Sequence, residues 1–148
     1  MKITKELAVQ PEELYSFIKE MVYNDVKSNI KNIKSIDDIQ EGIQYKKELK
    51  NKMGKNEIVT TRIERLNNHE YCVSFTGKQG KNTISYSFLP KDKNYTEVTY
   101  EETYEGVNTS TSFSYMIMSF ITSRNSKKRM EKMLFYIEEC ILRQKTLL

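Results

Sequence analysis

The spacing of apolar residues changes twice along this chain of 148 residues. After Pro11 apolar residues recur at helical spacing as far as Ile33, which predicts an amphipathic helix. From Ile43 to Tyr104 they alternate with polar residues between polar turns, which predicts antiparallel strands. From Phe113 to Ile141 the helical spacing returns. The chain therefore predicts an α+β fold in which a meander of strands lies between two helical segments.

Six segments show the alternation of a strand with one apolar and one polar face, and the first is residues 3–9. The other five follow from residue 43, separated by polar turns at 51–56, 67–68, 77–82 and 90–94. Such strands pack one face against a core and expose the other to water. The residues expected on the inner face are Ile43, Tyr45, Lys47, Leu49, Val59, Thr61, Ile63, Tyr71, Val73, Phe75, Ile84, Tyr86, Phe88, Val98, Tyr100, Glu102 and Tyr104.

The helical segments carry start and end signals. Pro11 followed by two glutamates suits the first turn of a helix, and Ser35 is placed to cap a short turn through Asp38. A continuous C-terminal helix over residues 111–143 would be roughly 50 Å long, whereas an eight-residue strand spans about 27 Å. The sequence therefore predicts that this helix overhangs the sheet or bends in its polar stretch, residues 122–129.

Charge and composition exclude several classes of function. The net charge is +4, and the basic residues are 19 Lys and only 5 Arg, which indicates a soluble mixed-sign surface rather than a nucleic-acid groove. Cys72 and Cys140 are far apart and the only histidine, His69, falls in a predicted turn. We therefore expect no metal site, no cofactor, no disulfide and no histidine-based catalysis.

No targeting or membrane segment is expected. Residues 1–6 lack the apolar run of a signal peptide, and the longest apolar-rich stretch, 113–121, is far shorter than the roughly 20 residues of a membrane span. We expect a cytoplasmic protein with residues 1–148 in a single domain, and the sequence leaves a homodimer open.

Several segments resemble a known superfamily. They are the strand-to-helix entry Val9-Gln10-Pro11-Glu12-Glu13-Leu14-Tyr15-Ser16-Phe17-Ile18, then Glu41-Gly42-Ile43-Gln44-Tyr45, Thr96-Glu97-Val98-Thr99-Tyr100-Glu101-Glu102 and Lys127-Lys128-Arg129-Met130-Glu131-Lys132-Met133-Leu134. With the order of elements, they resemble the START-like, polyketide-cyclase-like helix-grip superfamily (SRPBCC) and, within it, a small bacterial family of unknown function. The resemblance implies a curved antiparallel sheet wrapped around a long C-terminal helix, often with an apolar ligand between them. Superfamily members usually have seven strands, whereas six are counted in this sequence.

An aromatic inner face is the main candidate site. Inward tyrosines offer an apolar ring and a hydroxyl that can orient an amphipathic ligand, although a solid core with hydroxyls reaching water at its rim is an equally ordinary arrangement. With the resemblance, this favours a non-enzymatic binder of a small hydrophobic or amphipathic molecule. The candidate ligand-binding residues are Tyr45, Phe75, Tyr86, Phe88, Tyr100, Glu102, Tyr104, Met116 and Phe120.

Two other functions are open at this point. Glu102 is in phase with Tyr100 and Tyr104, so it should point inward, where a carboxylate needs a partner such as Lys47 or a raised pKa. The alternative is a residue at the end of its strand whose carboxylate reaches solvent. A cyclase- or hydratase-like enzyme could use Glu102 with a tyrosine, although no catalytic residue is assigned. Residues 113–132, apolar and then basic, could instead form a protein- or membrane-surface module.

Overall fold

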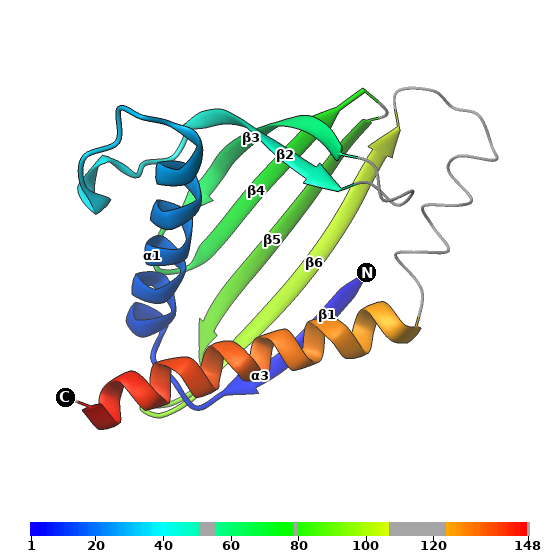
Figure 1. The fold of residues 1–148 in the computed structure, drawn as a ribbon. Coiled ribbons are helices and arrows are strands. Elements are labelled where there is room, and N and C mark those ends of the chain that lie inside the picture. Colours follow the sequence, from blue (N-terminus) through cyan, green and yellow to red (C-terminus); the bar gives the residue numbers. More distant parts are fainter. Residues whose placement is uncertain (51–55, 79, 107–123, 148) are drawn as a thin grey trace.

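The computed structural model describes residues 1–50, 56–78, 80–106 and 124–147 (Figure 1). In chain order the elements are β1 (Lys2–Leu7), α1 (Pro11–Asn29), the 3₁₀ turn η1 (Ile36–Asp38), β2 (Gln44–Lys50), β3 (Asn56–Leu66), β4 (Glu70–Gly77), β5 (Gly80–Pro90), β6 (Thr96–Gly106) and α3 (Arg124–Leu147). The six described strands form one antiparallel sheet in the order β1-β6-β5-β4-β3-β2. The predicted α+β class is confirmed.

Helix α1 begins where the sequence indicates but ends earlier than its apolar stripe. Pro11 occupies the first helical position, and the Gln10 backbone N–H donates to the Glu13 carboxylate at 2.9 Å, which closes the start of the helix. The buried stripe is Leu14, Ile18, Val22 and Val26. The helix ends at Asn29 because Ile30 turns to an extended backbone, so the continuation of the stripe to Ile33 packs on the core from outside the helix.

A bulge in β3 adjusts which residues face inward. The pairing with β4 shifts between Ile63 and Arg65, so that Ile63 pairs with Val73 and Leu66 pairs with Tyr71. Both Ile63 and Leu66 are therefore buried on the same side, although they are three positions apart in the sequence. Strict alternation alone would place Leu66 on the opposite face.

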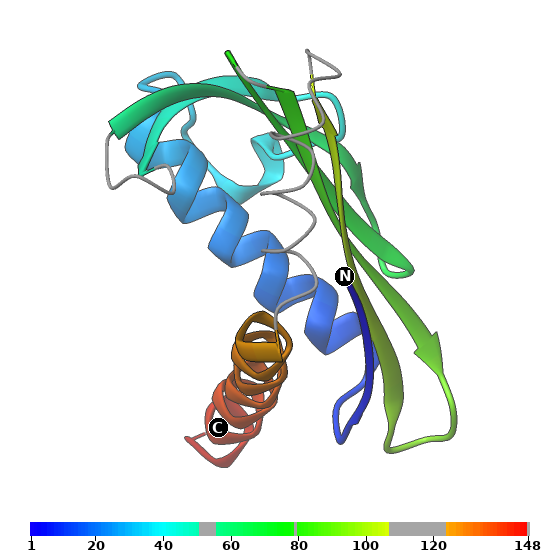
Figure 2. The same cartoon turned by 90° about the vertical axis from the view of Figure 1, so that its right-hand side faces the viewer.

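Both helices cover the same side of the sheet, which we call the inner face (Figures 1 and 2). Helix α3 runs along β1, and its residues Leu134, Ile137 and Ile141 are buried at helical spacing. The expected helix start near residue 111 lies outside the described residues, as does part of the stretch 122–129 in which a bend was expected.

Two further expectations concern thiols and membranes. Cys72 and Cys140 are both free and half-buried. Neither α1 nor α3, the helices of the described part of the chain, is long and apolar enough to cross a membrane.

Candidate functional site on the inner face of the sheet

The strand register gathers the predicted aromatic residues into rows across the inner face. One row runs from β2 to β6 as Tyr45, Thr61, Phe75, Asn82 and Tyr104, each opposite the next. A second row holds Leu66, Tyr71, Tyr86, Tyr100 and Ile3, on β3, β4, β5, β6 and β1. Each set of residues that the sequence puts in phase on one strand therefore lies on this face.

Burial divides the inner face into two ends. At the buried end, where α1 and α3 meet β1 and β6, side chains are at most 1% exposed: Leu7, Val9, Leu14, Val98 and Leu134. At the open end, on β4 to β6, the side chains are only half-buried: Phe75, Asn82, Ile84, Glu102 and Tyr104. Of the sequence-predicted site residues, Tyr45, Phe88 and Tyr100 are buried, and Phe75, Tyr86, Glu102 and Tyr104 are half-buried.

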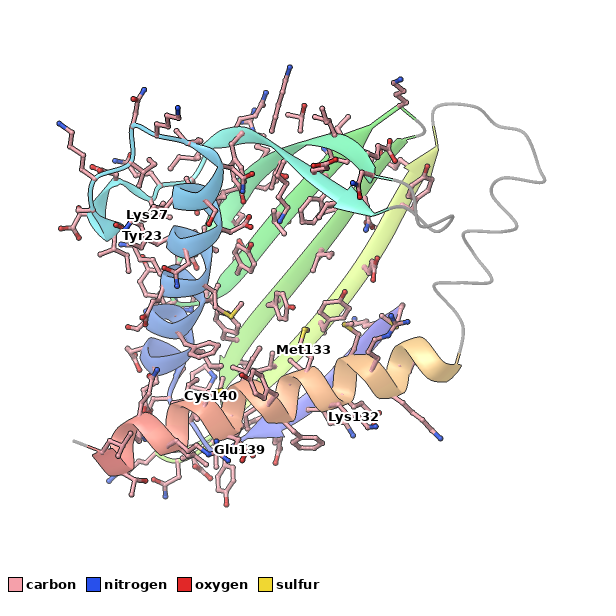
Figure 3. The ribbon with its side chains drawn as sticks, in the orientation of Figure 1. Tyr23, Lys27, Lys132, Met133, Glu139 and Cys140 are labelled. Atoms are coloured by element: carbon pink, nitrogen blue, oxygen red, sulfur yellow. The ribbon has the colours of Figure 1, made fainter. Side chains whose placement is uncertain are left out.

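Three tyrosine rings lie between the two ends. The rings of Tyr71 and Tyr86 stack with centroids 5.8 Å apart, and Tyr100 meets Tyr86 edge-on at 5.1 Å. The Tyr86 hydroxyl approaches the sulfur of Met133, which points from α3 toward the sheet, at 3.9 Å (Figure 3). Burial, followed by the charge of Glu102, raises the pKa of Tyr86 and of Tyr100 far above the ordinary value of 10. These phenols are therefore neutral hydrogen-bond donors at physiological pH.

Glu102 points inward, as expected, and its carboxylate accepts two hydrogen bonds. The Tyr100 hydroxyl donates to one oxygen at 3.0 Å, and Asn82 Nδ2 donates to the other at 3.0 Å. Within the described residues Glu102 has no cationic side chain in ion-pair range. The amino group of Met1 donates to the backbone carbonyl of Glu102 at 3.1 Å rather than to its carboxylate.

The expected pairing of Glu102 with Lys47 is wrong. Lys47 forms an ion pair of 3.0 Å with Asp25 of α1, and its ammonium lies 5.3 Å from the centre of the Phe75 ring. The Tyr45 hydroxyl donates to the same Asp25 carboxylate. The reason is the strand order, because β2 and β6 are four strand spacings apart, about 19 Å.

Two polar groups on the inner face were not among the candidate site residues: Thr61, which the alternation does place on this face, and Asn82, which falls in a predicted turn. Thr61 Oγ1 and Asn82 Oδ1 are buried and have no hydrogen-bond partner in the described part of the chain. Residues 77–82 were expected to form a turn, but β5 already begins at Gly80, so Asn82 is a strand residue. The signal was present, since Asn82 is in phase with Ile84, Tyr86 and Phe88.

Gly80 fixes the position of Tyr104 beside Asn82. A Cβ atom on Gly80 would lie 2.5 Å from the Tyr104 hydroxyl, and the backbone of Gly80 has a positive φ of 153°. Only glycine fits at this position, so the Tyr104 ring can lie against the strand at the open end.

Other sequence-predicted candidates are not part of this arrangement. Met116 and Phe120 lie outside the described residues, as does 113–123 of the proposed surface module. In the remainder of that module, Lys127, Lys128, Arg129 and Lys132 are exposed on α3. His69 is exposed in the turn between β3 and β4, as predicted.

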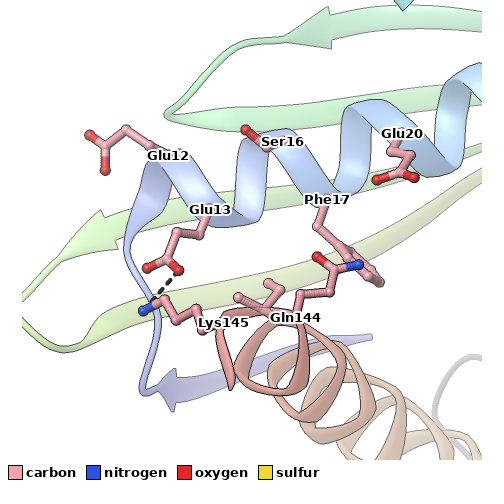
Figure 4. A pocket seen from close by; sticks show the side chains of 8 residues that line it. Glu12, Glu13, Ser16, Phe17, Glu20, Gln144 and Lys145 are labelled. Atoms are coloured by element: carbon pink, nitrogen blue, oxygen red, sulfur yellow. Dashed lines mark ion pairs between the residues drawn. The ribbon is translucent and has the colours of Figure 1, made fainter. Parts of the chain in front are cut away.

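An open groove of about 300 Å³ lies elsewhere, between the start of α1 and the end of α3 (Figure 4). Lys145 forms an ion pair of 2.8 Å with Glu13 across this groove. Its lining also includes the carboxylates of Glu12 and Glu20 and the apolar side chains of Phe17 and Ile141. None of the sequence-predicted site residues that the structure describes lines this groove. Among the described residues no group of three or more His, Cys, Asp or Glu side chains is placed to hold a metal ion.

Solved structures with the same fold cover nearly the whole chain. A protein of unknown function from Staphylococcus aureus, SA2116, aligns with a TM-score of 0.59 and 14% identity over 100% of this chain and 96% of its own. A START superfamily protein from Mycobacterium smegmatis gives 0.54 and 15% over 100% and 98%. A truncated norcoclaurine synthase from Thalictrum flavum gives 0.64 and 12% over 96% and 92%. At these identities the likeness shows the fold alone.

The sequence itself matches one family. No curated protein matches the chain. The domain of unknown function DUF3284 matches residues 1–123, which is most of the chain. The chain therefore belongs to the DUF3284 family, and its six-stranded sheet with an N-terminal and a C-terminal helix has the helix-grip fold of START-like proteins.

Proposed function

We propose that this protein binds a small amphipathic molecule at the open end of the inner face. One observation carries the proposal: Phe75, Ile84, Glu102 and Tyr104 stay half-exposed although they lie on the side of the sheet that both helices cover. Apolar side chains on an inner face are ordinarily sealed, as they are at the buried end. Partly exposed aromatic surface beside a few polar groups is the usual lining of a small-molecule site.

The chemistry of the open end supports an oriented ligand. Phe75, Ile84 and the tyrosine rings offer apolar contact, whereas Glu102 and Asn82 offer acceptors at one edge. The helix-grip fold is compatible with a ligand in this place, because many of its members hold one between sheet and C-terminal helix. Binding, rather than catalysis, fits the neutral phenols, since raised pKa values keep Tyr86 and Tyr100 protonated and make them poor proton donors in an acid–base step.

An acid–base enzyme is the second candidate, because the Tyr100 hydroxyl and the Glu102 carboxylate are hydrogen-bonded at 3.0 Å. In such an enzyme Glu102 would move the proton and Tyr100 would hold it in place. The two candidates share the same site, so a test of binding comes first.

Native mass spectrometry of the protein purified from its host tests the proposal. We expect a bound small-molecule mass on the wild type, and loss of that mass in Ile84→Trp, which fills the open end. Ser85→Trp is the matched control, because Ser85 is the next residue and faces the opposite side. The chain contains no tryptophan, so in each variant the fluorescence of the single new indole reports whether it lies where intended. A wild type without any bound mass, or an equal loss in both variants, would contradict the proposal.

A further inference from the structure

The charges of the inner face are unequally compensated. Asp25 has a cationic partner, because Lys47 pairs with it at 3.0 Å. Glu102, at the open end, has none among the described residues, and its two hydrogen bonds come from neutral donors. The charged Met1 amino group lies nearby, but it donates to the Glu102 backbone carbonyl and forms no ion pair with the carboxylate. A half-buried carboxylate without an ion-pair partner is costly, since part of its hydration is lost.

The neighbouring amide adds a second acceptor in the same place. Glu102 can only accept, so the Asn82 amide must turn its Nδ2 toward Glu102 and its Oδ1 away from it. Asn82 Oδ1 is then a buried acceptor that no described residue satisfies. The two donors nearest to the carboxylate, Tyr100 Oη and Asn82 Nδ2, are already used. Among the described residues, neither the remaining acceptor positions of the carboxylate nor Asn82 Oδ1 has an N–H donor of its own, because the nearby Met1 amino group donates to the Glu102 backbone carbonyl.

Aromatic rings surround the same carboxylate. Tyr100 and Tyr104 flank Glu102 along β6, and Tyr86 lies opposite Tyr100 on β5. The faces of tyrosine rings attract cations, most strongly where water is partly excluded. A carboxylate among tyrosine rings, with no cation of its own, has the chemistry of an ammonium site.

We propose that the ligand of the open end carries a protonated amine on an apolar, preferably aromatic, body, and that the amine pairs with Glu102. The half-exposed carboxylate makes the first contact. The unsatisfied Asn82 Oδ1 beside it is the second acceptor, although it is buried in the described structure. This inference rests on the proposed binding function and adds the chemical class of the ligand.

Three probes of nearly equal size separate charge from shape: 2-phenylethylamine, 2-phenylethanol and 3-phenylpropanoate. Isothermal titration calorimetry on the full chain should show the amine binding about tenfold or more tightly than the alcohol, as expected for one charged hydrogen-bonded contact, and the acid binding most weakly. This comparison uses only the wild-type protein, so it does not depend on whether a variant folds.

Glu102→Gln then tests the named carboxylate. It should weaken binding of the amine about tenfold and change binding of the alcohol little, because glutamine keeps the shape and loses the charge. Glu101→Gln is the matched control: it makes the same change in net charge one residue away, on the exposed opposite face, and should leave the amine affinity unchanged. The double substitution Glu12→Gln with Glu20→Gln should also leave it unchanged, since these residues line the other groove.

Each contrary outcome has a definite meaning. An amine that binds no more tightly than the alcohol overturns the inference but not the proposed function. An amine preference that survives Glu102→Gln, or that falls equally in Glu101→Gln or in the Glu12 and Glu20 variant, overturns it too, because the charge would act elsewhere. If none of the probes binds, the inference fails, and the mass spectrometric result then decides the proposed function separately.

Discussion

The two ends of the inner face use the same strands for different purposes. At the buried end Leu7, Val98 and Leu134 come from β1, β6 and α3 and exclude water almost completely. At the open end, a few residues further along β6, Glu102 and Tyr104 stay half-exposed beside Asn82. The difference teaches that the described elements concentrate their packing at one end, so that residues at the other end can carry polar groups that packing would exclude.

Four tyrosines of the inner face give the largest expected effect. Burial raises the pKa of Tyr45, Tyr71, Tyr86 and Tyr100 above the ordinary value of 10, so in the folded protein these phenols keep their protons after those of the unfolded chain have ionised. The unfolded state then binds fewer protons, so the stabilisation is complete below pH 10 and is lost as the pH rises above it. We expect the free energy of unfolding to fall by up to about 1.4 kcal/mol per pH unit for each such tyrosine.

Urea denaturation at a series of alkaline pH values measures this slope. Tyr86→Phe should remove the contribution of one tyrosine to the fall of the free energy of unfolding with pH. Tyr95→Phe is the control, because Tyr95 is 45% exposed, and it should leave that slope unchanged. Equal slopes in the two variants would show that Tyr86 is open to water in the folded protein. The distinction between a buried end and an open end of the inner face would then be wrong.

Truncation of one aliphatic side chain at each end gives the next largest effect. Leu134→Ala should cost about 3 kcal/mol, since it leaves a cavity in a region where Leu134 is 1% exposed. Ile84→Ala, at the open end, should cost only about 1 kcal/mol because Ile84 is half-buried. Chemical denaturation measures both, and similar costs would remove the distinction between the two ends.

Removal of one polar group at each end gives the smallest effect. The Thr96 hydroxyl is buried and donates to the Val9 carbonyl at 2.6 Å, so Thr96→Val should cost about 1–3 kcal/mol by leaving that carbonyl unpaired. Glu102→Gln should change the free energy of unfolding by less than about 1 kcal/mol. The glutamine oxygen can still accept from Tyr100, and the Asn82 amide can turn over so that its unpaired Oδ1 accepts from the new NH2 group. Thermal melts of the two variants provide the comparison, and a greater loss in Glu102→Gln would mean that Glu102 serves the fold.

The sequence predicts the faces of the strands well and their partners poorly. Period-two alternation correctly turned Tyr86, Tyr100 and Glu102 inward, because the side-chain direction in a strand is a local property. The pairing of Lys47 with Glu102 failed because the distance between two inward residues depends on strand order, which no local pattern contains.

Asn82 and Asp25 show two further limits. The glycines and lysines around Asn82 predict a turn, and the structure shows that Asn82 belongs to β5. Its spacing from Ile84 and Tyr86 agrees with the strand rather than with the turn. Asp25 reaches Lys47 and Tyr45 only through the packing of α1 against β2, a tertiary contact that the helical stripe does not encode. The partners of the inward polar groups, rather than the faces on which those groups lie, were therefore the part that the sequence could not supply.

The central claim is that a small molecule binds at the open end of the inner face, and NMR chemical-shift mapping tests this claim most directly. Titration of 2-phenylethylamine into the isotope-labelled protein should move the amide signals of Phe75, Ile84, Glu102 and Tyr104 and leave those of Leu7, Leu14 and Leu134 in place. Shifts confined to Glu12, Glu20 and Gln144 would assign the ligand to the groove between α1 and α3 and contradict the account.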